Sequence, residues 1–154
     1  MTARDWARFG QLFWQNGKWN GEQLLPDWWV KYATTPTPFA ELGNYGKLFL
    51  FLGKFRAEPD LVPRLCTHTG AQWWLNAGNK DDPSRRHFPR LPTDAFMALG
   101  YESQSVIVIP SRAAVIVRLG CSHPEAAFDV QEWVTQVLAA LPPAPAKAAA
   151  APAS

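Results

Sequence analysis

The sequence contains few cysteines, little net charge and no long apolar run. Two cysteines in 154 residues, Cys66 and Cys121, are too few for a disulfide scaffold. Fifteen basic and 13 acidic side chains give a formal net charge of +2, which offers no electrostatic basis for binding nucleic acid. The apolar run Leu48–Leu52 is far shorter than the roughly 20 residues of a membrane span. We therefore expect neither a nucleic-acid partner nor a membrane-spanning segment.

The sequence also lacks a usual metal-binding motif and a signal peptide. Cys66-Thr-His68 and Cys121-Ser-His123 are two Cys-x-His pairs, and four such side chains are enough for a tetrahedral zinc site. Cys-x-His is not a usual zinc spacing, however, so we expect no metal and no other cofactor. The first residues, Met-Thr-Ala-Arg-Asp, are polar and charged. They assign the protein to no compartment, so the bacterial cytoplasm and the periplasm both remain possible locations.

Apolar and aromatic side chains are abundant. Hydrophobic residues make up 47% of the chain and there are eight tryptophans, a composition typical of a packed globular domain. We expect that domain to cover residues 1–141, with an unusual insertion at 47–70 that fits no regular pattern. The tail 142–154 is rich in Ala and Pro and has no large apolar side chains to offset the entropy of ordering, so we expect it to be disordered.

The order of the predicted elements indicates an α+β fold. Thr2 followed by Asp5 predicts a helix start, and a tight turn at 110–112 predicts that the strands on either side are antiparallel. The predicted elements are a helix from residue 3 to Asn16-Gly17, a short helix with Pro26 in its first position, strands near 72–76, 95–109 and 113–119, and a helix near 128–141. We therefore expect an antiparallel sheet flanked by helices.

Three segments of the chain resemble the C-terminal part of the β-lactamase-related serine hydrolases. This family includes class C β-lactamases, D-Ala-D-Ala peptidases, related esterases and aminohexanoate-oligomer hydrolases. The segments are Thr2-Ala-Arg-Asp-Trp-Ala-Arg-Phe-Gly10 with Asn16–Gly21 and Leu25–Trp29, then Tyr45-Gly46 with Gly70-Ala-Gln-Trp-Trp74, and finally Ala98–Gln104 with Val106–Ser111. The first segment is the most specific match. The resemblance implies a partial β-lactamase/transpeptidase-like fold.

The resemblance also implies a reaction and a set of site residues. In this family a serine within Ser-x-x-Lys attacks an amide, ester or β-lactam carbonyl, and the lysine and the tyrosine of Tyr-x-Asn manage the protons. The backbone N–H of Tyr101 would be the oxyanion donor on the active-site strand. Ala98, Leu99 and Gly100 would bind substrate along that strand. Gln104 would support the site by hydrogen bonding.

Two further interpretations concern the walls of the site. Trp73 is a candidate to line the substrate cleft, although adjacent strand residues face opposite sides, which leaves packing in the core as the alternative. Ala98 stands where many family members carry His or Lys, and Ser103 where the family usually has Gly. The first departure argues against a β-lactamase within the family. The second adds a side chain close to the site.

The nucleophile motif is missing. No Ser-x-x-Lys and no Tyr-x-Asn occur in the chain, and the resemblance places both upstream of the segment that begins here. We expect Met1 to fall partway through a family domain, and the chain to be inactive alone. In its full-length context the partner would be a small amide or ester substrate.

Two alternatives involve no catalysis by the chain. One is a truncated fragment or small interaction module, whose exposed apolar surface would favour self-association. The other is a partner that docks on a separate chain that carries the nucleophile.

Overall fold

The computed structural model describes residues 1–36, 70–78, 86–122 and 128–144, and its fold class is α+β. The elements are α1 (Ala3–Trp14), β1 (Lys18–Trp19), β2 (Glu22–Gln23), α2 (Asp27–Ala33), β3 (Trp74–Leu75), β4 (Phe96–Leu99), β5 (Ser105–Ile109), β6 (Ala114–Arg118) and α5 (Val130–Ala140). Short 3-10 turns cover Tyr101–Ser103 and Pro110–Arg112.

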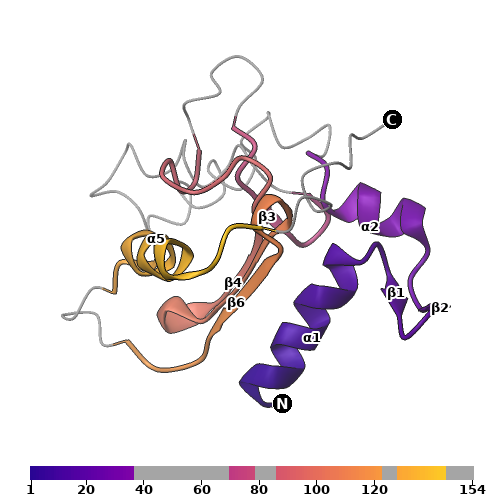
Figure 1. Cartoon of the computed structure of the whole chain (residues 1–154), viewed down its shortest axis with the longest axis horizontal. Helices are drawn as coiled ribbons and strands as arrows, with labels where there is room; N and C mark the ends of the chain where they lie inside the picture. The colour runs from indigo at the N-terminus through magenta and orange to yellow at the C-terminus, as the bar shows by residue number, and fades with distance from the viewer. Residues whose placement is uncertain (37–69, 79–85, 123–127, 145–154) are drawn as a thin grey trace, which may run out of the picture.

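The fold has a four-stranded antiparallel sheet between two helices. The strand order is β3-β4-β5-β6, and each strand is antiparallel to its neighbours. Figure 1 shows α1 and α5 on opposite sides of this sheet, with the small β1–β2 hairpin beyond α1. The expected antiparallel sheet flanked by helices is confirmed.

Alternation along the strands divides the core into two clusters. In β5, Ile107 and Ile109 pack on the α5 side with Val134 and Leu138, whereas Val108 packs on the α1 side with Phe13. All five residues of β5 are buried. A central strand covered on both faces by helices accounts for its almost continuous run of β-branched residues.

The helix α1 has the start and end that the sequence predicts. The Thr2 hydroxyl accepts a hydrogen bond from the Asp5 amide, and the Asp5 carboxylate accepts one from the Thr2 backbone N–H. These hydrogen bonds with Thr2 lower the pKa of Asp5. After the helix, Asn16 and Gly17 both take positive φ values, 52° and 80°, which turn the chain toward β1.

The prediction of one strand over 95–109 is wrong. Phe96–Leu99 and Ser105–Ile109 are separate strands that pair antiparallel, so the chain reverses between them. The Gly100 amide donates to the Gln104 carbonyl at 2.8 Å, and Glu102 and Ser103 have positive φ values of 58° and 64°. Two successive residues with positive φ give the twist that a tight hairpin turn requires.

Two other predicted boundaries also change. The strand expected at 72–76 is limited to Trp74–Leu75, because Gln72 has a φ of 73° that breaks the extended conformation. The short helix begins at Asp27, with Pro26 as its N-cap and not its first helical residue. The predicted turn at 110–112 is confirmed, and Ala113 closes it in the left-handed region with a φ of 47°.

Asn76 fixes the loop that leads into β4. Its side chain is fully buried, and its amide nitrogen lies 3.0, 3.1 and 2.9 Å from the carbonyl oxygens of Phe88, Leu91 and Pro92. Its amide oxygen accepts a hydrogen bond from the Phe88 N–H at 2.8 Å. Because buried polar groups need partners, one side chain here holds a loop of irregular backbone against the core.

Several expectations fall outside the described residues. Apart from Gly70, the insertion expected at 47–70 is among them, and so is most of the tail, residues 145–154. In the part of the chain that is described, every helix is too short or too polar to cross a membrane.

Candidate functional site

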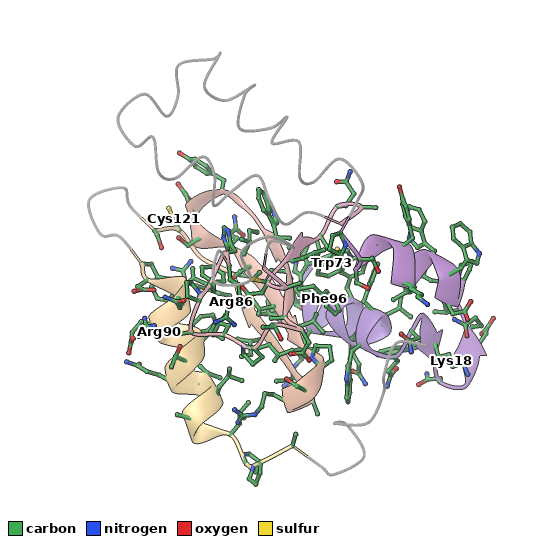
Figure 2. All side chains as sticks on the ribbon, turned by 90° about the horizontal axis from the view of Figure 1, so that it is seen from above. Lys18, Trp73, Arg86, Arg90, Phe96 and Cys121 are labelled. Carbon is green, nitrogen blue, oxygen red and sulfur yellow. The ribbon has the colours of Figure 1, made fainter. Side chains whose placement is uncertain are left out.

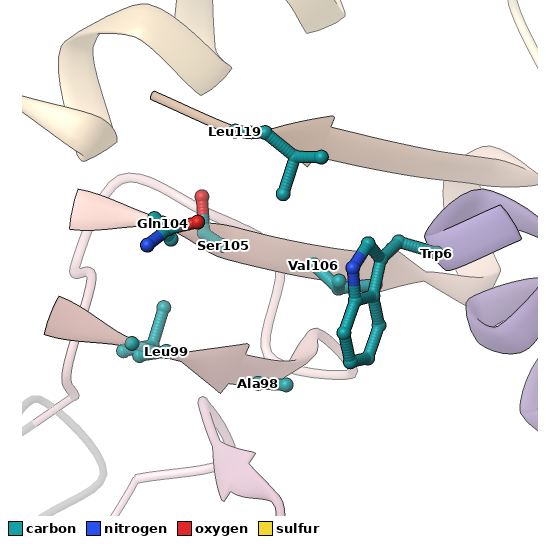
Figure 3. Close-up of a pocket in the computed structure, with 8 residues that line it drawn as sticks. Trp6, Ala98, Leu99, Gln104, Ser105, Val106 and Leu119 are labelled. Carbon is teal, nitrogen blue, oxygen red and sulfur yellow. The ribbon is translucent and has the colours of Figure 1, made fainter. Parts of the chain in front are cut away.

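A pocket of about 270 Å³ opens at the end of the sheet where β4 turns into β5 (Figure 3). Its lining comes from α1, from both strands of the hairpin and from the residue after β6. The lining residues are Trp6, Ala98, Leu99, Gly100, Gln104, Ser105, Val106 and Leu119. Figure 3 shows Trp6 reaching across Val106 and Leu119 pointing toward β5. The pocket is thus a meeting point of four segments.

Strand alternation places the pocket on the α1 side of the sheet. Ala98 packs with the cluster that includes Phe13 of α1, whereas Leu99 packs with the cluster on the α5 side. Ser105 alternates with Val106, so its side chain also faces α5. Leu99 and Ser105 therefore present their backbone to the floor of the pocket. The side chains of Trp6 and Val106 form its walls.

Among the described residues, the end of β4 next to the pocket is unpaired on its β3 side. Only Phe96 and Met97 of β4 pair with β3, through Leu75 and Trp74. Within the described residues, the Ala98–Leu99 segment has a strand partner on the β5 side alone. An unpaired strand edge carries backbone donors and acceptors that an extended ligand can use.

Arg118 holds the turn at the mouth of the pocket. Its guanidinium donates to the carbonyls of Glu102 and Ser103, both at 3.1 Å, and to the Ser122 hydroxyl at 2.6 Å. It also lies over the Phe128 ring, 4.0 Å from the ring centre. The two residues with positive φ are therefore fixed from outside the turn by a side chain of β6.

The Glu102 carboxylate faces Cys121. The thiol donates a hydrogen bond to this carboxylate, which raises the pKa of Cys121, and the negative charge on Glu102 acts in the same direction. A thiol whose pKa is raised is a weaker nucleophile near neutral pH than a free cysteine. The raised pKa therefore does not favour Cys121 as an activated nucleophile.

Four of the six predicted site residues lie together. Ala98, Leu99, Gly100 and Gln104 all line the pocket. The other two, Tyr101 and Trp73, do not.

Tyr101 lies in the turn beside the pocket. Its side chain is 83% exposed and outside the lining. Its backbone N–H, the predicted oxyanion donor, has no backbone carbonyl as acceptor among the described residues. The turn thus leaves this N–H without a backbone hydrogen bond in the described chain.

Trp73 lies in the core between the sheet and α1. It is 4% exposed, and its ring stacks on Phe9 at 5.9 Å and meets Phe96 edge-on at 5.0 Å (Figure 2). Trp73 therefore packs in the core, which was the alternative to a position in the substrate cleft.

Sequence reasoning missed four residues of the lining, namely Trp6, Ser105, Val106 and Leu119. Along α1, Trp6 contacts Phe9 and Phe9 contacts Phe13, and the packing of this helix on the sheet places Trp6 over the pocket. Gly10 makes the close packing possible, because a Cβ there would lie 2.7 Å from Val115. Nothing local in the sequence marks Leu119, which reaches the pocket through the β5–β6 register.

The metal hypothesis finds no support in the described residues, which contain no group of three or more His, Cys, Asp or Glu side chains able to hold an ion. Cys121 is exposed. Cys66, His68 and His123 lie outside the described residues.

Comparison of the chain with protein-family models finds no match, and comparison with curated proteins finds no significant match.

Proposed function

We propose that this chain is the C-terminal portion of a β-lactamase-related serine hydrolase, and that the pocket is part of its substrate site. The observation that carries the proposal is that two separate arguments select the same four residues. The resemblance assigns Ala98, Leu99, Gly100 and Gln104 to the site, and the same four residues line one pocket.

The backbone of the β4–β5 turn supports the proposal. Ser103 stands where the family usually has Gly, and its φ of 64° is a conformation that favours Gly. The chain therefore keeps the backbone geometry of a Gly position although it carries a serine there.

In this proposal the chain contributes binding and electrostatic stabilisation. The open edge of β4 pairs with the substrate backbone, and Gly100 allows a close approach because it has no side chain. The Tyr101 N–H donates to the oxyanion of the tetrahedral intermediate. The nucleophilic serine and its lysine come from outside the chain, which contains no Ser-x-x-Lys. The chain alone is therefore inactive, and the parent enzyme cleaves amide or ester bonds through an acyl-serine.

The proposal is tested on the polypeptide that the full reading frame encodes, with p-nitrophenyl acetate as substrate. The key variant is Gly100→Val. A Cβ at this position would lie 3.6 Å from the Gln104 Cβ, an ordinary contact, and the φ of −121° suits a β-branched residue, so the fold tolerates it. We expect kcat/KM to fall by about tenfold or more, the effect of removing one transition-state contact.

Thr93→Val is the matched control, because it also introduces a valine, here at an exposed position outside the pocket. Its kcat/KM should equal that of the wild type. Hydrolysis that Gly100→Val leaves unchanged, or a polypeptide without hydrolytic activity, would overturn the proposal.

The alternative of a non-catalytic interaction module rests on a different observation. Leu24, Trp28 and Tyr32 are 50%, 65% and 51% exposed on or next to α2. Apolar side chains exposed together favour association with another surface.

A further inference from the structure

Among the described residues, the lining of the pocket contains no ionisable side chain. Its walls are the side chains of Trp6, Ala98, Val106 and Leu119, and its floor includes backbone of the two strands. Gln104 carries the neutral amide among the side chains of the lining, and an amide both donates and accepts hydrogen bonds. The chemistry of these walls suits an apolar group with a neutral polar end.

Two charged groups close in sequence to the pocket, Arg118 and Glu102, are engaged elsewhere. Arg118 shares a strand face with Ile116, which packs in the α5-side cluster, and its guanidinium is held by the carbonyls of Glu102 and Ser103. Glu102 faces Cys121. None of these groups is in the pocket lining, so the described residues of the lining offer no cation to a bound carboxylate.

Desolvation decides which ligands fit such a site. A carboxylate that leaves water for an apolar pocket without a cationic partner loses its hydration and gains little in return. A neutral amide or ester of the same shape loses much less. The size is also informative, because a cavity of about 150 Å³ is enough for benzene, and this pocket measures about 270 Å³.

We propose that the pocket selects an uncharged, largely apolar group about the size of one substituted aromatic ring. If the chain is part of a hydrolase, as proposed above, the preferred substrates are neutral amides or esters. Ligands that would place a carboxylate in this pocket are rejected. The inference about substrates therefore rests on the proposed hydrolase function. As a statement about binding it concerns this chain alone and needs no catalysis.

The test compares benzamide with benzoate, which have nearly the same shape and differ in charge at neutral pH. Binding of each to the purified chain is measured by titration calorimetry. We expect benzamide to bind with a Kd about tenfold or more below that of benzoate, because of the desolvation cost.

Leu119→Arg provides the charge-adding variant. Leu119 lines the pocket and is 42% exposed. An arginine there can place its guanidinium at the pocket, and because the position is partly exposed, the substitution does not bury a charge in the core. We expect this variant to lower the Kd of benzoate about fivefold or more and to narrow the preference for benzamide. Leu24→Arg is the matched control, since Leu24 is 50% exposed and outside the lining. It should leave both Kd values unchanged.

The outcomes separate this inference from the hydrolase proposal. Benzoate binding as tight as benzamide binding, no benzamide binding, or equal effects of the two arginine variants would each overturn the inference and leave hydrolysis untouched. Selective benzamide binding by a chain whose full reading frame yields no hydrolase would support the inference and overturn the hydrolase proposal alone.

Discussion

Asn76 and Ser105 are the two buried polar residues of the described core, and their surroundings differ sharply. Asn76 has backbone partners for both ends of its amide. The Ser105 hydroxyl is buried with no hydrogen-bond partner in the described part of the chain. We therefore predict that Asn76→Ala lowers the free energy of unfolding by about 3 kcal/mol, because several buried or half-buried backbone groups lose their partner.

Ser105→Ala serves as the comparison in the same denaturant-unfolding experiment. Removing a hydroxyl that is already unpaired should leave stability within about 0.5 kcal/mol of the wild type, or raise it. A large loss of stability in Ser105→Ala, or a small one in Asn76→Ala, would contradict this interpretation of the core.

Packing of α1 on the sheet depends on Gly10. A Cβ there would lie 2.7 Å from the nearest methyl of Val115 and 3.2 Å from methyls of Val106 and Val108. Alanine favours a helix over glycine by about 1 kcal/mol, but overpacking costs about 1–3 kcal/mol. We predict that Gly10→Ala lowers the thermal midpoint despite the better helix propensity.

A Val115→Ala background tests the reason for that loss. It removes the methyl that the new Cβ would meet, so Gly10→Ala should cost about 1 kcal/mol less there than in the wild type. An equal cost in both backgrounds would show that contact with Val115 is not the cause.

The β4–β5 turn gives a second prediction at this scale. Ser103 has a φ of 64°, where an L-residue is strained and glycine is not. We predict that Ser103→Gly raises the free energy of unfolding by about 0.5–1 kcal/mol, measured by urea unfolding. Gln104→Gly, at a φ of −66°, is the control and should lower it. Destabilisation by Ser103→Gly would contradict the assigned turn.

The elements that the sequence predicted well are those specified by neighbours along the chain. Thr2 and Asp5 define the start of α1 by themselves, and Asn16-Gly17 defines its end. The reversal at 100–104 was missed because non-glycine residues adopt positive φ there and the stabilising contact comes from Arg118, far along the chain. Four residues that the resemblance assigns to the site line the pocket, whereas Trp6 and Leu119 join it only through tertiary packing.

The exposed aromatic surface of α2 bears on the behaviour of the whole molecule. Trp28 meets Trp29 edge-on at 5.9 Å, and Trp29 lies 5.8 Å from Tyr32, so the rings form one continuous group. Trp28 and Tyr32 are mostly exposed. We predict that copies of the chain associate through these rings, because contact between them releases water from apolar surface. Sedimentation experiments should show association that increases with protein concentration.

Trp28→Arg combined with Tyr32→Arg should shift the chain toward monomer. Leu141→Arg, at an exposed leucine beyond the end of α5, is the control and should not. A wild-type chain that stays monomeric at all concentrations would contradict the prediction.

The central proposal is that the chain is part of a serine hydrolase, and the nucleotide sequence upstream of the Met1 codon tests it most directly. We predict an open frame that encodes Ser-x-x-Lys and then Tyr-x-Asn before the present start. That result would join the missing nucleophile to the strand and pocket described above. An in-frame stop codon close upstream, or a coding sequence without these two motifs, would contradict the claim.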